Sequence, residues 1–514
     1  MNPSENAGIL RYLRLLVFVC GLVTLGAEMA ASRLLAPYFG TSLPVWSSLI
    51  GLILLALALG YTIGGRIADR SPKLPSLLTI VASAGVCLVL LPLISRPILL
   101  VLMSALVKLK LGILLGSFVS VIVLLGVPMM MLGCVTPFAV RLATADVEHA
   151  GRSAGSLFAW STMGSVIGSF LPVLVLIPSV GTRMTFMIFG ALLLLLAAAG
   201  YLYCRRRKAG LISALILVGI LPAAMWLSRT PIKPGDNVLF EGESPYQYVR
   251  VTEDELGWRQ LSMNEGFVTH SKYHPLHTLT FGEWDFFAVA PYFNAAPYDP
   301  LTRVKRWGII GLGAGTTARL ISGLYGPIQI DGVEIDPMVV EVGRKYFELD
   351  RPNLNVAIQD GRAWIATATN QYDVIAIDAY RQPYIPFELT TVEFFQQVHD
   401  RLMEAGVVCI NVAEPNKDKR LVHALAATIN QVFPSVFILN LRDRSGATLV
   451  IGTKALAAPE DFASNAEKAS GVLGVLTAEA GTRLQAFHGE GAVLTDDRAP
   501  VERLMDLMIF RAIG

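Results

Sequence analysis

Trp307-Gly-Ile-Ile-Gly311-Leu-Gly313-Ala-Gly315-Thr-Thr is the stretch that decides the fold of the second half of this chain. An apolar strand runs directly into a glycine-rich turn and then into a helix, and such glycines let the backbone approach a ligand at the helix N-terminus. Further strands are expected at 328–333, 355–358 and 374–378, with helices between them. This alternation predicts a mostly parallel sheet flanked by helices, an α/β fold of the Rossmann-like kind.

Acidic side chains follow three of these strands, at the edge where parallel sheets bind ligands. Glu334, followed by Ile335, ends the second strand about twenty residues after the glycine turn, where an acid can accept both hydroxyls of a ribose. Asp360, followed by Gly361, comes after the third strand, where a carboxylate can take an adenine amino group, and Asp378 ends the fourth. Each acid alone is equally compatible with a helix cap, but strand ends in register favour an adenosine site.

The first part of the chain has a different composition. The 514 residues are 53% hydrophobic and 16% charged, with a mean hydropathy of +0.54, whereas soluble proteins carry about 25% charged residues. Of the 42 Lys and Arg, 17 lie before residue 231, but only 5 of the 40 Asp and Glu do. The sequence therefore predicts an apolar, basic membrane domain joined to an acidic soluble one.

Seven apolar runs reach the roughly 18 residues that cross a bilayer: 15–37, 45–63, 77–94, 111–131, 157–177, 184–203 and 211–227. A shorter run at 97–107 is ambiguous between an eighth span and a re-entrant piece. We expect a membrane α-helical bundle of seven or eight helices at 1–230. A small β-rich part at 231–295, with strands near 243–251 and 260–269, and the Rossmann-like domain at 296–514 follow it.

Two patterns within the predicted bundle bear on its role. Residues 60–64 and 164–168 have the glycine spacing that lets helix backbones approach closely in lipid, which we interpret as packing. Glu28 and Arg33 lie inside the first span, where ionisable residues are costly and often functional. The segment 65–70 resembles a loop of major facilitator transporters, so transport is an alternative function.

Basic residues in short loops favour the cytoplasmic side of a membrane. With seven spans, the N-terminal arginines and the cluster 205–208 lie inside and the soluble half lies outside. With eight spans the soluble half lies inside, but the cluster 205–208 lies outside. The charges leave both arrangements open. Because adenosine compounds are cytosolic, we expect an inner-membrane protein with a cytoplasmic soluble half.

Residues 240–450 resemble spermidine synthases, and the whole chain resembles a bacterial group of membrane-fused spermidine synthases. The resemblance implies a methyltransferase-type Rossmann sheet behind a small β domain. It also implies that an amine attacks the carbon beside the sulfonium of decarboxylated S-adenosylmethionine, releasing methylthioadenosine. By motif, Gln247 and the glycine turn with Gly311, Gly313, Ala314 and Gly315 would hold this ligand. Glu334 and Ile335 would lie at the ribose, Asp360 and Gly361 at the adenine, and Asp378 at the reacting end.

The chain departs from the spermidine synthase pattern at two positions. Those enzymes carry an acid inside the glycine loop that meets the aminopropyl ammonium, and Ala314 stands in its place. They also carry a second acid that deprotonates the attacking amine, and Arg381 stands there. Arginine cannot act as a base at neutral pH, because its pKa exceeds about 12, and it suits a bidentate carboxylate instead. We therefore expect intact S-adenosylmethionine rather than its decarboxylated form as the substrate.

The leading hypothesis is an integral-membrane enzyme that cleaves the sulfonium on its carbon chain and releases methylthioadenosine, as a lyase, a cyclase or an aminocarboxypropyl transferase. The alternatives are a true aminopropyltransferase, a methyltransferase, and a transporter whose soluble domain senses the ligand. The catalytic candidates are Asp378, Tyr380, Arg381 and Tyr246, with Glu265 also lining the pocket.

No metal and no nucleic acid is expected. His270, His274 and His277 have helical spacing, but no acid or cysteine completes a usual zinc set, so hydrogen-bonded or solvent-facing histidines are the simpler interpretation. The basic residues lie at membrane boundaries rather than in a stripe with interleaved aromatics. The expected partners are the lipid bilayer and a small-molecule substrate, and a homodimer is left open.

Overall fold

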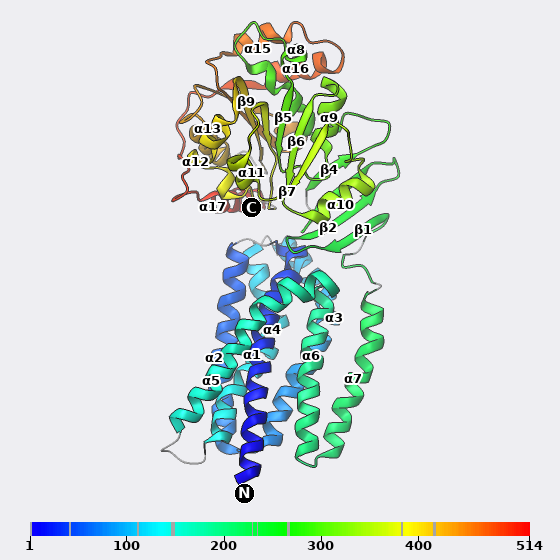
Figure 1. Cartoon of the computed structure of the whole chain (residues 1–514), viewed down its shortest axis with the longest axis vertical. Coiled ribbons are helices and arrows are strands. Elements are labelled where there is room, and N and C mark those ends of the chain that lie inside the picture. The colour runs from blue at the N-terminus through cyan, green and yellow to red at the C-terminus, as the bar shows by residue number, and fades with distance from the viewer. Residues whose placement is uncertain are drawn as a thin grey trace. The chain divides into compact units, whose positions relative to one another are not determined.

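Figure 1 shows a computed structural model of the chain, which describes residues 3–513 except 41–42, 110–112, 145–149, 229, 234, 265–267, 382–383 and 415–417. The chain forms two compact units. The first consists of Met1–Gly235 with Glu241–Tyr248, and the second of Asp236–Phe240 with Val249–Gly514. The expected boundary after residue 230 lies near the end of the first unit, which also takes in the tip of the first β-hairpin.

The first unit is a helical bundle (Figure 1). Its helices are α1 (Pro3–Phe39), α2 (Leu43–Arg70), α3 (Leu74–Leu109), α4 (Ile113–Ala143), α5 (Ala150–Leu171), α6 (Ile177–Tyr203) and α7 (Arg207–Ser228). A π-helical turn, Pro172–Leu176, joins α5 to α6. Five stretches of the described residues are long and apolar enough to cross a membrane: Gly8–Phe39, Val45–Arg70, Leu74–Leu102, Leu115–Ala143 and Gly151–Tyr203. The predicted membrane bundle is confirmed, and these helices indicate a membrane-embedded region.

The run 97–107 is neither an eighth span nor a re-entrant piece. Helix α3 continues through Pro92 and Pro97 to Leu109, so this run is its last part. A proline inside a helix removes one hydrogen bond without ending the helix when neighbouring groups compensate. The predicted close packing of 164–168 is confirmed, because a Cβ at Gly164 would overlap the carbonyl of Phe18 on α1.

The second unit contains an eight-stranded sheet in the order β12-β10-β11-β9-β8-β5-β6-β7. Its strands are β5 (Arg306–Ile310), β6 (Gln329–Glu334), β7 (Leu354–Ile358), β8 (Tyr372–Ile377), β9 (Leu402–Ala413), β10 (Ser435–Asn440), β11 (Ala447–Thr453) and β12 (Leu484–Ala486). β5 pairs in parallel with β6 and β8, and β7 and β9 extend the parallel part. β10, β11 and β12 are antiparallel. The predicted Rossmann-like fold is confirmed as a mixed sheet.

Helices cover both faces of this sheet. One face packs against α9 (Thr316–Tyr325), α15 (Pro459–Ala466), α16 (Gly471–Arg483) and the 3-10 helix η3 (Glu283–Phe293). The other packs against α11 (Gly361–Thr367), α12 (Val392–Asp400), α13 (Arg420–Ile429) and α17 (Val501–Ile513).

A four-stranded antiparallel sheet precedes the large one, as the predicted β-rich part requires. It consists of β1 (Val238–Glu243), β2 (Tyr248–Glu253), β3 (Arg259–Met263) and β4 (Thr269–Tyr273). The expected strand at 260–269 is wrong in extent: β3 ends at Met263 and β4 begins at Thr269. This sheet shares an apolar cluster with α10 (Pro337–Tyr346).

Candidate active site

The glycine turn after β5 has the backbone that its sequence predicts. Gly311, Gly313 and Gly315 have φ values of +86°, +55° and +94°, a region that residues with a Cβ adopt at a cost of roughly 1–2 kcal/mol. A Cβ at Gly311 would lie 2.5 Å from the nitrogen of Ala379, just after β8. The turn is therefore pressed against the end of the neighbouring strand.

Ala314 occupies the position where spermidine synthases carry an acid. Its side chain is fully buried in the cluster shared by the small sheet and α10. Its N–H donates to the Ser271 hydroxyl at 2.9 Å, which fastens the turn to β4. The methyl group at this position packs, and an acid there would be buried among apolar side chains.

Glu334 ends β6 and holds the glycine turn. One carboxylate oxygen accepts the N–H of Gly313 at 2.9 Å and the other accepts the N–H of Asp336 at 3.1 Å. Burial raises the pKa of Glu334 to about 7, against the opposing effect of these N–H groups. Each carboxylate oxygen has a second lone pair, so Glu334 retains the capacity to accept ribose hydroxyls. Ile335, the next residue, is half-buried.

Asp360 is the N-cap of α11. Its carboxylate accepts the N–H of Ala363 at 2.9 Å, so the cap interpretation holds for one of its oxygens. Gly361 follows, and a Cβ there would lie 2.6 Å from the Ile310 side chain at the end of β5. The α11 N-terminus is thereby held close to the glycine turn, as an adenine site at this edge requires.

Asp378 follows β8, and donors fill both oxygens of its carboxylate. The indole Nε1 of Trp284 donates to one oxygen at 2.9 Å, and the Asn411 amide donates to the other at 2.9 Å. Burial, together with the nearby Glu283 carboxylate, raises the pKa of Asp378 to about 7, against the opposing effect of the two donors. Asp378 is thus a positioned carboxyl group that titrates near neutrality.

Tyr380 lies beside Asp378 but uses its hydroxyl on β9. The hydroxyl donates to the carbonyl of Asn411 at 2.9 Å and accepts the N–H of Ala413 at 2.8 Å. The side chain of Arg381 is exposed, and its backbone pairs with that of Tyr384. Tyr380 is therefore placed as a positioning residue, and a role for Arg381 at the reacting end stays a prediction.

Tyr246 and Gln247 lie in the turn between β1 and β2. Their N–H groups both donate to the Ser244 hydroxyl at 3.0 Å. They belong to the first compact unit, so their role at the sheet edge stays a prediction. Glu265 lies outside the described residues.

Sequence reasoning missed three side chains near Asp378, and also the buried Glu414 just after β9. Glu283 and Trp284 come from η3, and Asn411 and Glu414 come from the end of β9. The positions of Asn411 and Glu414 could have been predicted from the sequence, because they stand at the end of a fifth apolar strand. Nothing in the local sequence placed the start of η3 beside β8.

Two of the three histidines, His274 and His277, form a ring cluster with Trp258. The rings of His274 and His277 lie 4.6 Å apart, and Trp258 stacks on His277 at 5.5 Å. No group of three metal-binding side chains occurs among the described residues.

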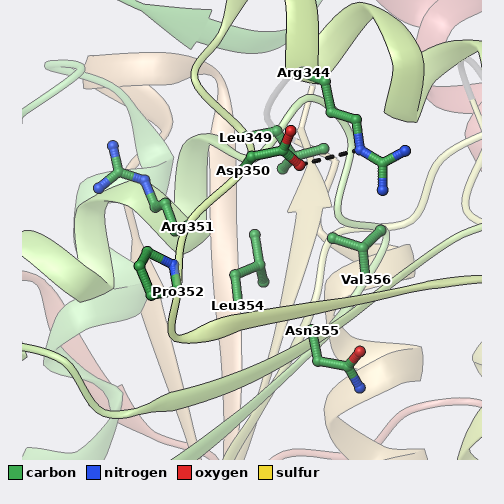
Figure 2. Close-up of a pocket in the computed structure, with 8 residues that line it drawn as sticks. All are labelled: Arg344, Leu349, Asp350, Arg351, Pro352, Leu354, Asn355 and Val356. Atoms are coloured by element: carbon green, nitrogen blue, oxygen red, sulfur yellow. Dashed lines mark hydrogen bonds and ion pairs between the residues drawn. The ribbon is translucent and has the colours of Figure 1, made fainter.

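A surface pocket of about 500 Å³ lies elsewhere on the second unit (Figure 2). Its lining includes the Arg344–Asp350 ion pair, at 3.1 Å, and Leu354 at the start of β7. Because parallel sheets bind ligands at the carboxyl ends of their strands, a pocket at the amino end of β7 is not the candidate active site.

Residues 297–451 match the spermine/spermidine synthase domain family. The match covers part of the second compact unit, which we call the synthase domain. The matched range contains the glycine turn, Glu334, Asp360 and Asp378, whereas Glu283 precedes it. The strand-end acids predicted from the sequence thus lie within the synthase domain.

Relatives of the synthase domain carry related names. The probable polyamine aminopropyl transferase of Bifidobacterium longum is 29% identical over 287 residues, which are 52% of this chain and 62% of that protein. The polyamine aminopropyltransferase of Vibrio vulnificus is 32% identical over 148 residues, 28% of this chain and 48% of that protein. The chain thus spans less than two thirds of these relatives. A solved structure, a probable spermidine synthase from Corynebacterium glutamicum, has a TM-score of 0.39 at 21% identity, covering 49% of this chain and 96% of that one.

Proposed function

We propose that this chain is an integral-membrane transferase of the aminopropyltransferase type, which transfers the carbon chain of an S-adenosylmethionine-type sulfonium to an amine and releases methylthioadenosine. The observation that carries the proposal is the convergence of Glu334, Asp360 and Asp378 on the glycine turn, at the carboxyl ends of the parallel strands of the sheet. The match to the synthase domain family supports the same reaction class. The resemblance implies decarboxylated S-adenosylmethionine as the sulfonium substrate.

In this mechanism the sheet edge holds the nucleoside and Asp378 faces the reacting atoms. The amine nitrogen attacks the carbon beside the sulfur, the carbon–sulfur bond breaks, and its electron pair returns to the sulfur. The positive charge passes from the sulfonium to the new ammonium nitrogen. An ionised Asp378, fixed by Trp284 and Asn411, stabilises that charge on both sides of the step, and positioning of the two reactants supplies several kcal/mol more.

The comparisons support aminopropyl transfer better than the lyase hypothesis. The relatives from Bifidobacterium longum and Vibrio vulnificus are both named as transferases. The two substitutions that motivated a lyase also have plain structural explanations. Ala314 packs in an apolar cluster, and Arg381 is exposed.

Product analysis tests the proposal. Detergent-purified full-length protein is incubated with intact or decarboxylated S-adenosylmethionine, each with and without putrescine, and the products are separated by chromatography and weighed by mass spectrometry. We expect methylthioadenosine and an aminopropylated diamine from the decarboxylated substrate only when the amine is present. Methylthioadenosine from intact substrate alone would establish a lyase, S-adenosylhomocysteine would establish methyl transfer, and binding without turnover would favour a ligand-sensing transporter.

We further propose the bacterial cell membrane as the location, the lipid bilayer and a small-molecule amine as partners, and leave a homodimer as an assembly to test. Blue native electrophoresis of the detergent-purified chain checks the last point. The expectation of a cytoplasmic soluble half rests on the cytosolic supply of the ligand. The distribution of Lys and Arg between the two ends of the bundle favours the opposite side of the membrane.

A further inference from the structure

Glu283 is a second carboxylate beside Asp378. It is the first residue of η3, and the next residue, Trp284, donates its indole N–H to Asp378. The Ser445 side chain hydrogen-bonds the Glu283 carboxylate. Burial raises the pKa of Glu283, the neighbouring Asp285 raises it further, and Lys272 opposes the shift. Two carboxyl groups from different elements therefore share one partly buried region.

The turn that presents Glu283 is fixed by its neighbours. Asp285 is fully buried and accepts the N–H and hydroxyl of Thr280 and the N–H of Phe281, at 2.8–2.9 Å. Lys272 donates to the Thr280 carbonyl at 3.1 Å and lies over the Trp258 ring at 4.3 Å. Asp285 and Lys272 are used within the turn itself, whereas the Glu283 carboxylate, bonded by Ser445, lies on the side of Asp378 and can still accept from a ligand.

The polar atoms left without partners in this region are acceptors. Asn411 is 6% exposed and donates its amide N–H to Asp378, whereas its Oδ1 has no hydrogen-bond donor within the described structure. Glu414 is 2% exposed; the Thr448 hydroxyl bonds one carboxylate oxygen, and the other has no donor there. Glu414 also donates its N–H to the carbonyl of Gly446, next to Ser445. Buried acceptors without donors cost about 1–3 kcal/mol each and are satisfied by a ligand rich in N–H donors.

We propose that Glu283 and Asp378 together form the binding site for a cationic amine. Glu283 is then the base that deprotonates the amine, a role that Arg381 cannot fill. This inference rests on the proposed function. The bound ammonium gives one proton to the Glu283 carboxylate and becomes a neutral amine, which then attacks the carbon beside the sulfonium. The product leaves as a secondary ammonium, and Glu283 releases its proton to water. The acceptor is therefore an aliphatic amine or diamine rather than a carboxylate.

Calorimetric titration of full-length protein with putrescine, in saturating methylthioadenosine, tests the pair. Glu283→Gln keeps the shape and the bond to Ser445 but removes the charge, and we expect roughly 10- to 100-fold weaker putrescine binding with unchanged methylthioadenosine affinity. Glu283→Asp should recover part of the loss. Glu341→Gln, an exposed acid on α10, is the matched control, and melting temperatures confirm that each variant folds.

This inference would be overturned by putrescine binding to Glu283→Gln as tight as to the wild type, or by a wild type that prefers 4-aminobutyrate, which carries a carboxylate in place of the second amine. A wild type that binds no putrescine overturns it as well. Where turnover is measurable, Glu283→Gln should also lose the neutral-pH limb of its pH–rate profile. Amine binding that depends on Glu283, without any aminopropylated product, would support the site and refute the proposed function.

A second inference comes from the bundle alone. The start of α1, the start of α3 and the end of α6 lie at one end, since Tyr12 donates to the Leu196 carbonyl at 2.8 Å and Thr79 lies 3.0 Å from the Tyr201 hydroxyl. The Asp69–Arg141 ion pair at 3.3 Å joins the ends of α2 and α4. The basic residues of these termini and their connections are Arg11, Arg14, Arg66, Arg70, Lys73, Arg141, Arg152, Arg205, Arg206, Arg207 and Lys208.

The chain leaves the bundle at the other end. Tyr38, near the end of α1, donates to the Ile232 carbonyl at 3.4 Å, and Arg183, near the start of α6, donates to the Thr230 carbonyl at 3.1 Å. Fewer basic residues of the described part of the chain fall at this end: Arg33, Arg96, Lys108, Arg183 and Lys233. Because Lys and Arg in short loops favour the cytoplasmic side, the exit at residues 230–235 lies on the side away from the cytoplasm.

We infer that the synthase domain, which continues from this exit, is extracytoplasmic. The consequence for function is that an S-adenosyl compound reaches the domain only by crossing the membrane. Protease treatment of intact spheroplasts carrying the full chain, with an epitope at each terminus, tests the inference. We expect loss of the C-terminal epitope and retention of the N-terminal one. Retention of both until the membrane is permeabilised would overturn it.

Discussion

Gly311→Ala is the most informative single substitution in the candidate active site. Gly311 has a φ of +86°, which costs an alanine about 1–2 kcal/mol. Its new Cβ would lie 2.5 Å from the nitrogen of Ala379 and 2.6 Å from the carbonyl carbon of Asp378. These are backbone atoms, so relief requires the turn after β5 to move away from the end of β8, where the N–H of Asp378 donates to the Ile310 carbonyl at 2.8 Å. Overpacking of this kind costs about 1–3 kcal/mol.

Together these effects predict a loss of about 2–5 kcal/mol in the free energy of unfolding of the synthase domain and a clear loss of methylthioadenosine affinity. Gly471→Ala is the matched control, because Gly471 has a φ of +58° and no atom within 4 Å of the added Cβ. It should carry the strain alone and leave nucleoside binding intact. Thermal unfolding and titration with methylthioadenosine measure both effects. A Gly311→Ala protein that unfolds and binds like Gly471→Ala would refute the close contact between the turn and β8.

Three further substitutions test other parts of the structure. The pKa of Glu334 is raised to about 7 in the fold, so from about pH 4.5 to 7 its carboxyl is protonated in the folded chain and ionised in the unfolded chain. The free energy of unfolding therefore falls by up to about 3 kcal/mol as the pH rises through this window. Glu334→Gln should flatten the resulting change in melting temperature between pH 5 and pH 8. Ser271→Ala leaves the buried N–H of Ala314 without its acceptor and should cost about 1–3 kcal/mol, seen as a lower melting temperature. In the bundle, Gly164→Ala should separate α5 from the α1 backbone and cost about 1–3 kcal/mol, whereas Gly155→Ala, with no atom near its added Cβ, should leave the melting temperature in detergent unchanged.

The sequence predicted the parts of the structure that depend on local pattern. The apolar strands, the glycine turn and the acids at strand ends all follow from period and position, so the places of Glu334 and Asp378 at the ends of β6 and β8 could be predicted. The run 97–107 was misjudged because it was treated as a separate short apolar run, whereas α3 continues through Pro92 and Pro97 into it.

The surroundings of Asp378 could not be predicted in the same way. Trp284 and Glu283 lie about ninety residues earlier in the sequence, and only the folded chain brings η3 to the end of β8. The exposure of Arg381 likewise depends on the turn it forms with Tyr384. The expectation of intact S-adenosylmethionine as the substrate was drawn from Arg381 at a family motif, and the exposed position of this side chain does not require it.

The dependence of methylthioadenosine formation on amine concentration tests the central claim most directly. Full-length protein is supplied with saturating decarboxylated S-adenosylmethionine, and the initial rate is measured as putrescine is raised from zero. We expect no methylthioadenosine at zero amine, a rate that saturates with putrescine, and one aminopropylated amine for each methylthioadenosine released. Methylthioadenosine formed at its full rate without any amine would contradict aminopropyl transfer and support the lyase hypothesis.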